Sequence, residues 1–128
     1  MKAILLDTHA AIWFFNGSPN LSETAKQVIL DPNNRINVSV ASVWELAVKI
    51  NIGKLKFTDG VAGFLKLIDN NGFRLLNVLP KHLLELERLP LYHRDPFDRM
   101  LIAAAISEGM NFVTADKDIP LYPLPCVW

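Results

Sequence analysis

Short apolar runs alternate with stretches of helical periodicity along this chain, and the alternation constrains the fold more than any other feature. Strands are predicted at residues 3–6, 35–40, 73–78, 111–114 and 122–127. Helices are predicted at residues 8–15, 22–30, 41–52, 59–70, 80–89 and 97–108. Two prolines in the last strand confine it to an edge of the sheet. The alternation predicts an α/β fold, with a mostly parallel sheet covered on both faces.

The length and composition predict one domain that spans residues 1–128. Hydrophobic residues make up 51% of the chain, enough for a sizeable core. The 13 basic and 13 acidic residues cancel, so composition alone does not indicate a nucleic-acid-binding surface. Cys126 is the single cysteine, which excludes an internal disulfide and suits the reducing cytoplasm. The N-terminal apolar run ends at Asp7, too soon for a signal peptide or a membrane span, so we expect a cytoplasmic protein.

Four acidic residues lie where a predicted strand meets a helix, or in the first turns of a helix: Asp7, Glu45, Asp98 and Asp116. Ligands of parallel sheets gather beyond the carboxyl ends of the strands, so we expect these side chains to meet there. Carboxylates in close contact either raise each other's pKa or recruit a cation. Oxygen ligands without histidine or cysteine suit Mg²⁺. The four residues therefore predict a divalent-metal site.

Helix capping is the competing explanation for the first two of these acids. Asp7 could cap the helix that follows it, although Thr8 is equally suited to capping, which would leave Asp7 for a metal. Ser42 and Glu45 match a capping box, in which the glutamate reaches back to its cap. Ser39 is an alternative cap that would place Glu45 deeper in the helix and free its carboxylate.

The other two acids have similar alternatives. Asp95 precedes a proline at a helix start and is assigned to capping, whereas Asp98 is assigned to the site. Asp116 is preferred over Asp118 as a ligand because it is nearer the strand end, and Thr114 beside it could hydrogen-bond a carboxylate. Further along the chain from Glu45, Thr58 is expected to cap the helix predicted at residues 59–70.

Histidines and basic residues carry weaker signals. His82 is expected on a helix surface, and His9 on the first helix. His93 precedes the Asp95 cap, where it could contact a substrate or serve only the loop. The candidates for contacts with substrate phosphates are Lys49, Lys54, Arg94 and Arg99.

Five motifs occur in a characteristic order and spacing: LLDTH at residues 5–9, SVWELAVK at 42–49, GKL at 53–55, HRDPFDRMLIA at 93–103 and TAD at 114–116. Together they resemble the PIN-domain family, and specifically its VapC-type toxin ribonucleases of type II toxin–antitoxin systems. The resemblance covers essentially the whole chain. One departure is Ala104, where many members of the family carry glutamine.

The resemblance implies a fold, a site and partners. The fold is a three-layer α/β/α arrangement whose sheet has the strand order 3-2-1-4-5. Asp7, Glu45, Asp98 and Asp116 match the acidic quartet that holds one or two Mg²⁺ or Mn²⁺ ions per subunit, and Thr114 matches a hydroxyl residue beside the last acid. A homodimer and a cognate antitoxin protein are the implied partners, and RNA is the implied substrate.

The sequence thus predicts a Mg²⁺- or Mn²⁺-dependent endoribonuclease that hydrolyses RNA phosphodiester bonds as the toxin of a toxin–antitoxin pair. A receiver-like regulatory domain is one alternative, but it needs an aspartate after a central strand, where this chain has a helical glutamate. A PIN-fold binding module without catalysis is another. A phosphatase of the haloacid dehalogenase type would need an acid at position 9, where His9 stands.

Overall fold

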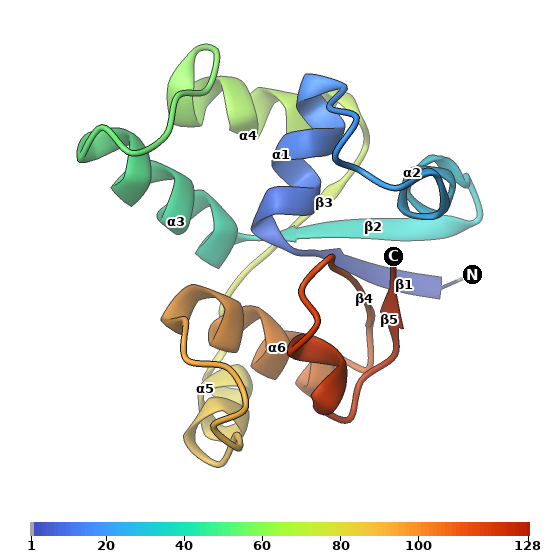
Figure 1. Ribbon diagram of the computed structural model, residues 1–128, viewed down its shortest axis with the longest axis vertical. Coiled ribbons are helices and arrows are strands. Elements are labelled where there is room, and N and C mark those ends of the chain that lie inside the picture. Colours follow the sequence, from blue (N-terminus) through green and yellow to red (C-terminus); the bar gives the residue numbers. More distant parts are fainter. Residues whose placement is uncertain (1) are drawn as a thin grey trace.

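The computed structural model of the protein describes residues 2–128, which include a single five-stranded sheet in the order β3-β2-β1-β4-β5 (Figure 1). All four strand pairs are parallel. The strands are β1 (Lys2–Leu6), β2 (Asn34–Ser39), β3 (Arg74–Leu76), β4 (Asn111–Val113) and β5 (Cys126–Val127). This confirms the expected strand order. The fifth strand does lie at an edge, but it is shorter than predicted, because Tyr122 ends a 3₁₀ turn, η1 (Ile119–Leu121).

Helices cover both faces of the sheet (Figure 1). One layer contains α1 (Thr8–Asn16), α2 (Glu23–Leu30) and α4 (Gly60–Asn70), and the other contains α5 (Pro80–Glu87) and α6 (Pro96–Glu108). Helix α3 (Val40–Asn51) leaves the carboxyl end of β2 and contacts both α4 and α6. The three-layer arrangement is therefore confirmed. Within residues 2–128, no helix combines the length and the apolar character needed to cross a membrane.

The side chains of the central strands alternate between two hydrophobic cores. Ile4 and Leu6 pack under α1, α2 and α4, whereas Leu5 packs under α5 and α6. In the same way, Phe112 belongs to the core under α5 and α6, and Val113 belongs to the core under α1, α2 and α4. Successive residues of a strand point to opposite faces, so the apolar runs in the sequence correspond to strands buried on both faces.

The helix starts decide one open cap assignment and correct another. Asp7, and not Thr8, caps α1, and the Thr8 hydroxyl instead donates to Ser42 Oγ at 2.9 Å. Thr58 does not cap α4, because that helix begins at Gly60 after Asp59, which has a left-handed backbone with φ of 60°. In both cases the local sequence offers two neighbouring residues of similar capping propensity, and the tertiary structure determines which of them precedes the helix.

The order of the strands places a topological switch point between β1 and β4. From β1 the chain proceeds outward to β2 and β3, and then returns to β4 on the other side of β1. The connections after β1 and β4 therefore diverge, and ligands of open parallel sheets bind at such switch points. The first residue past β1, Asp7, donates its backbone N–H to the Val113 carbonyl at 3.0 Å, which places it beside the end of β4.

Gly63 is a site at which the packing of α4 can be tested. A Cβ atom at this position would lie 2.8 Å from Asp59 Cβ and closer still to the Thr58 carbonyl oxygen. We expect Gly63→Ala to lower the free energy of unfolding by about 1–3 kcal/mol, because backbone must move to admit the methyl group. Chemical denaturation would measure this loss. Lys66→Ala, an exposed change in the same helix, should alter stability by less than about 0.5 kcal/mol. Equal stability of the two variants would contradict the packing argument.

Candidate active site

Asp7 lies at the switch point between β1 and β4 and is only 7% exposed. Its Oδ1 accepts the Ala10 N–H at 2.8 Å, and its Oδ2 accepts the Thr114 hydroxyl at 2.7 Å. Burial raises the pKa of Asp7 above its ordinary value, although these two hydrogen bonds act in the opposite direction. Asp7 thus caps α1 with one oxygen and faces the end of β4 with the other. A carboxylate oxygen has a second lone pair, so capping does not exclude metal binding.

Glu45 projects from the second turn of α3. Ser39 caps this helix, because its Oγ accepts the Ala41 N–H at 3.0 Å. The capping box of Ser42 and Glu45 therefore does not form. The Glu45 carboxylate is not used for capping, as expected if Ser39 is the cap. Glu45 is 3% exposed, and its Oε2 pairs with Lys49 Nζ at 2.6 Å. Its Oε1 is buried and has no hydrogen-bond partner among residues 2–128. A buried carboxylate oxygen with no donor is suited to a cation.

Asp98 lies in the first turn of α6, next to the cap residue Asp95. Asp95 Oδ1 accepts the backbone N–H groups of Phe97 and Asp98 at 2.8 and 3.0 Å, which confirms its capping role. Burial raises the pKa of Asp98 to about 7, with further contributions from the charges of Asp95, Asp7 and Glu45. These acidic residues come from different segments of the chain, yet their charges act on the same carboxyl group.

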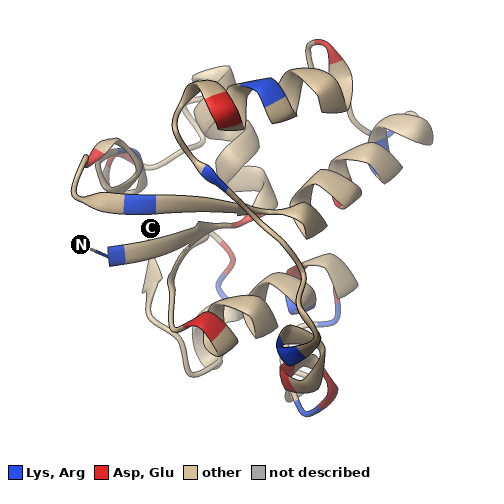
Figure 2. Cartoon of the chain, turned by 180° about the vertical axis from the view of Figure 1, so that it is seen from behind, with Lys and Arg blue, Asp and Glu red and all other residues tan. Residues whose placement is uncertain are grey.

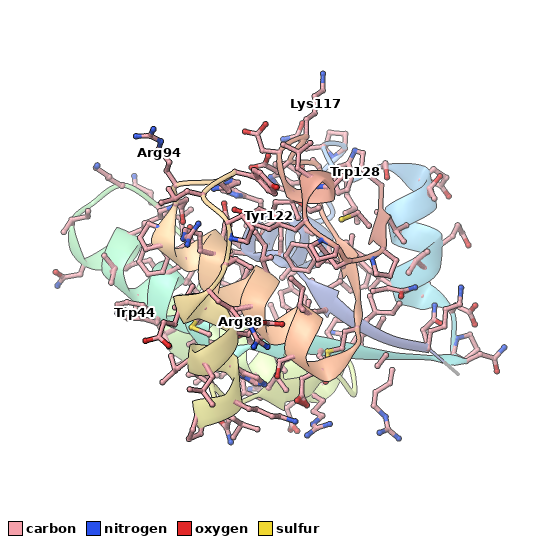
Figure 3. All side chains as sticks on the ribbon, turned by 90° about the horizontal axis from the view of Figure 1, so that it is seen from below. Trp44, Arg88, Arg94, Lys117, Tyr122 and Trp128 are labelled. Atoms are coloured by element: carbon pink, nitrogen blue, oxygen red, sulfur yellow. The ribbon has the colours of Figure 1, made fainter. Side chains whose placement is uncertain are left out.

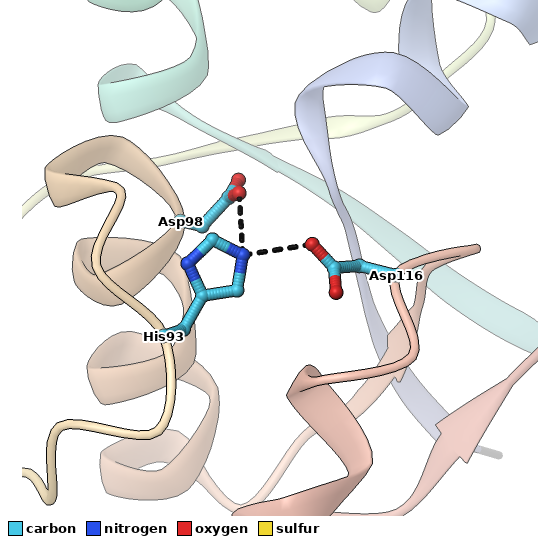
Figure 4. Close-up of side chains that lie close together, drawn as sticks. All are labelled: His93, Asp98 and Asp116. Atoms are coloured by element: carbon cyan, nitrogen blue, oxygen red, sulfur yellow. Dashed lines mark hydrogen bonds and ion pairs between the residues drawn. The ribbon is translucent and has the colours of Figure 1, made fainter.

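Asp116 follows β4 and meets Asp98 through a histidine (Figure 4). His93 Nε2 lies 2.7 Å from Asp116 Oδ2 and 3.2 Å from Asp98 Oδ2. Burial alone would raise the pKa of Asp116, but the Asp118 N–H and His93 hold it below its ordinary value. Burial acts against protonation of His93, yet the hydrogen bond to Asp116 and the nearby carboxylates raise its pKa overall. One potential ligand atom from each of His93, Asp98 and Asp116 lies within 4.8 Å of the other two.

Thr114 links the parts of this cluster. Its hydroxyl donates to Asp7 Oδ2 and accepts the backbone N–H of Asp116 at 3.0 Å. The expected hydrogen bond to a carboxylate is therefore present. The residues fit a divalent cation, because they offer hard oxygen donors and the buried Glu45 Oε1 lacks a donor.

The basic residues expected to contact substrate phosphates lie in different surroundings. Lys and Arg residues are scattered over both helical layers (Figure 2). Lys49 lies in the cluster, where its hydrogen bond to Glu45 raises its pKa. Lys54 and Arg94 are exposed, and Arg94 extends away from the body of the protein (Figure 3). Arg99 donates to the carbonyl oxygens of three residues of the preceding loop, Leu89, Pro90 and His93.

Sequence reasoning missed three side chains. His82 is not on a helix surface: it is fully buried, and its Nδ1 accepts the Leu79 N–H at the start of α5. The sequence does not decide whether His93 contacts a substrate or serves only the loop. Its contact with two acids depends on the fold, because Asp116 is distant in the sequence. Tyr122 holds the loop before α6 through its hydroxyl group. Only the position of His93 two residues before a helix cap could have drawn attention to it.

A profile described as the PIN domain matches residues 4–123 of this chain. The match covers nearly the whole sequence, and the chain therefore belongs to the PIN-domain family. A curated relative, Ribonuclease VapC22 of Mycobacterium tuberculosis, is 29% identical over 118 residues, which is 91% of this chain and 89% of the relative.

Solved structures share this fold. VapBC2 from Rickettsia felis, bound to a promoter DNA fragment, gives a TM-score of 0.74 at 18% identity, over 98% of this chain and 97% of that one. Mycobacterium tuberculosis VapC20, a toxin that cleaves the sarcin–ricin loop, gives a TM-score of 0.68 at 16% identity, over 94% of this chain and 95% of that one. At these identities the similarity establishes the fold.

The raised pKa of Asp98 predicts how the metal-free protein responds to pH. An aspartate has an ordinary pKa of 3.8 and titrates here at about 7, so the folded state binds this proton more tightly than the unfolded state does. The free energy of unfolding should therefore fall as pH rises from about 5 to 8, by up to about 3 kcal/mol. The raised pKa of His93 acts in the same direction. Thermal melts in EDTA across this range would measure the effect.

Asp98→Asn should remove most of this pH dependence and stabilise the metal-free protein at pH 8, because the amide has no proton to lose. Asp118→Asn, at an exposed neighbour of the cluster, should retain the slope of the unmodified protein. An unaltered slope in the Asp98→Asn protein would show that repulsion at this position does not control the stability.

Proposed function

We propose that this single-domain protein is a divalent-metal-dependent endoribonuclease and the toxin of a toxin–antitoxin pair. The proposal rests chiefly on the contacts among the acidic residues: Thr114 links Asp7 to Asp116, and His93 lies between Asp116 and Asp98. Asp7 raises the pKa of Asp98, and Glu45 raises the pKa of both Asp7 and Asp98, which also supports a shared site. The proposal is further supported by membership of the PIN-domain family and by the similarity to Ribonuclease VapC22.

Asp7, Asp98 and Asp116 would hold the ion, which is Mg²⁺ or Mn²⁺, with one or two ions per subunit. When bound, such an ion supplies the Lewis acidity that activates water and stabilises charge on a phosphodiester. Glu45 either binds the ion through Oε1 or orients the attacking water. Thr114 fixes the direction of the Asp7 carboxylate, and Lys49 fixes that of Glu45.

RNA is the proposed substrate, and it would be held by the basic residues around the cluster. Lys49 is within the site, and Lys54 and Arg94 are free to reach phosphates from its surroundings. A phosphate contact by Arg99 stays a prediction, and its hydrogen bonds to loop carbonyls give it a structural role as well. The protein has no net charge, so we expect modest RNA affinity that weakens as salt is added.

We further propose a cytoplasmic homodimer that binds a cognate antitoxin protein over the active site. VapBC2 of Rickettsia felis and VapBC-1 of Haemophilus influenzae, which share the fold, were solved as VapBC proteins. Several large apolar side chains of this chain are exposed and could serve such contacts: Trp44, Leu83, Leu84 and Leu91.

The catalytic proposal is tested by RNA cleavage with purified protein. We expect cleavage in Mg²⁺ or Mn²⁺, its loss in EDTA, and a fall on the order of 100-fold or more in Asp98→Asn or Asp7→Asn, because each change removes a ligand charge. Asp118→Asn is the matched control and should cleave normally. Undiminished cleavage by the Asp98→Asn protein would contradict the proposed site. Antitoxin binding without any cleavage would favour the binding module instead.

The toxin proposal is tested separately in cells. Expression of the protein should arrest growth, and expression of the small protein encoded beside it should relieve the arrest. Asp98→Asn should not arrest growth but should still bind that small protein, since the exposed apolar side chains proposed for this contact are unchanged. Co-purification of the two chains would measure the complex. Arrest that persists in the Asp98→Asn protein would separate toxicity from this site.

A further inference from the structure

The loop before α6 is held tightly against the site. Tyr122 accepts the His93 backbone N–H at 2.9 Å and donates its own hydroxyl hydrogen to the Pro90 carbonyl at 2.6 Å. Arg99 Nη1 donates to the carbonyls of Pro90 and His93 at 3.1 and 3.0 Å. Both backbone polar groups of His93 are therefore engaged, and the position of its side chain is determined by the fold.

The His93 ring is oriented as a hydrogen-bond donor. Its Nδ1 accepts the Asp95 backbone N–H at 3.1 Å, while its Nε2 points between Asp98 and Asp116 (Figure 4). A backbone N–H can only donate, so it opposes a hydrogen on Nδ1. In this geometry the neutral ring carries its hydrogen on Nε2, which donates to the Asp116 carboxylate.

This orientation distinguishes His93 from a metal ligand. A histidine that coordinates a metal through one nitrogen usually donates the N–H of its other nitrogen to an acceptor. Here the other nitrogen faces a donor, the Asp95 N–H. Coordination through Nε2 would require a hydrogen on Nδ1 and would set two donors against each other.

We propose that His93 is a positioning residue of the metal site, which holds Asp116 and Asp98 through its Nε2–H and does not itself bind the ion. Asp116 Oδ1 accepts the Asp118 N–H at 2.8 Å, so with His93 on Oδ2 both oxygens are directed. In the metal-free protein, the Nε2–H group of His93 also reduces the electrostatic repulsion between the carboxylates of Asp98 and Asp116. The inference rests on the proposed function, because that function identifies Asp98 and Asp116 as metal ligands.

The ring itself provides a test that does not depend on catalysis. In metal-free protein labelled with ¹⁵N, at a pH high enough for the ring to be neutral, we expect the His93 Nε2 signal to be that of a nitrogen bearing hydrogen, and the Nδ1 signal to be that of an unprotonated nitrogen. Saturation with Mg²⁺ should leave this assignment unchanged. A reversed assignment, or loss of the Nε2 hydrogen when Mg²⁺ binds, would overturn the proposal.

Metal titrations of His93 variants give a second readout. His93→Ala should weaken Mg²⁺ and Mn²⁺ binding by the same factor, about 10- to 100-fold, since loss of a group that orients a ligand has effects of this size. His93→Gln, whose amide N–H can reach the place of Nε2, should recover most of the affinity. Arg88→Ala, at the start of the same loop and with a side chain that is 78% exposed, is the matched control and should bind both ions normally.

The outcomes separate this inference from the function on which it rests. Unchanged affinities in His93→Ala would overturn the inference alone, and so would a selective loss of Mn²⁺, because a nitrogen ligand contributes more to Mn²⁺ than to Mg²⁺. Failure of the unmodified protein to bind either ion would overturn the proposed metal site, and the inference with it. Thermal melts of each variant would show that any loss occurs in folded protein.

Discussion

Repulsion between buried carboxylates is the constraint on which the site depends. Asp7 and Glu45 are almost entirely buried, and Asp98 is pushed to a pKa of about 7 by burial and by its acidic neighbours. Hydrogen bonds from Ala10 and Thr114 direct Asp7, and Lys49 pairs with Glu45, yet these contacts do not remove the excess negative charge. A divalent cation would remove it. The cluster is thus a site whose charge is balanced when an ion is bound.

The topology of the sheet makes this repulsion unavoidable. Parallel pairing of β1 with β4 brings the residues after both strands to one edge, although Asp7 and Thr114 are 107 positions apart in the chain. Helix α6 adds Asp98 from the opposite layer, and α3 adds Glu45 from the end of β2. Each acid also has a local structural role or partner, such as the cap that Asp7 forms for α1. Capping and metal binding are therefore compatible functions of the same carboxylate.

Local patterns predicted much of the fold, because buried strands and helix starts have short-range signals. The strand order followed from family resemblance, and the gathering of acids followed from the parallel sheet. The sequence did not decide between Asp7 and Thr8 as the cap of α1, and the expected cap at Thr58 was wrong. Those choices depend on tertiary contacts, such as the hydrogen bond from Thr8 to Ser42. The role of His93 was missed for the same reason, since Tyr122, Arg99 and Asp116 approach it from distant parts of the sequence.

The most direct measurement of the central claim is the location of Mn²⁺ by anomalous X-ray scattering from crystals of the protein. The scattering peak should lie between the carboxylates of Asp7, Asp98 and Asp116, within coordination distance of their oxygens, with His93 hydrogen-bonded to Asp116 and outside the coordination shell. A peak bound elsewhere on the protein, or none at this place under saturating Mn²⁺, would contradict the assignment of these residues as a metal site.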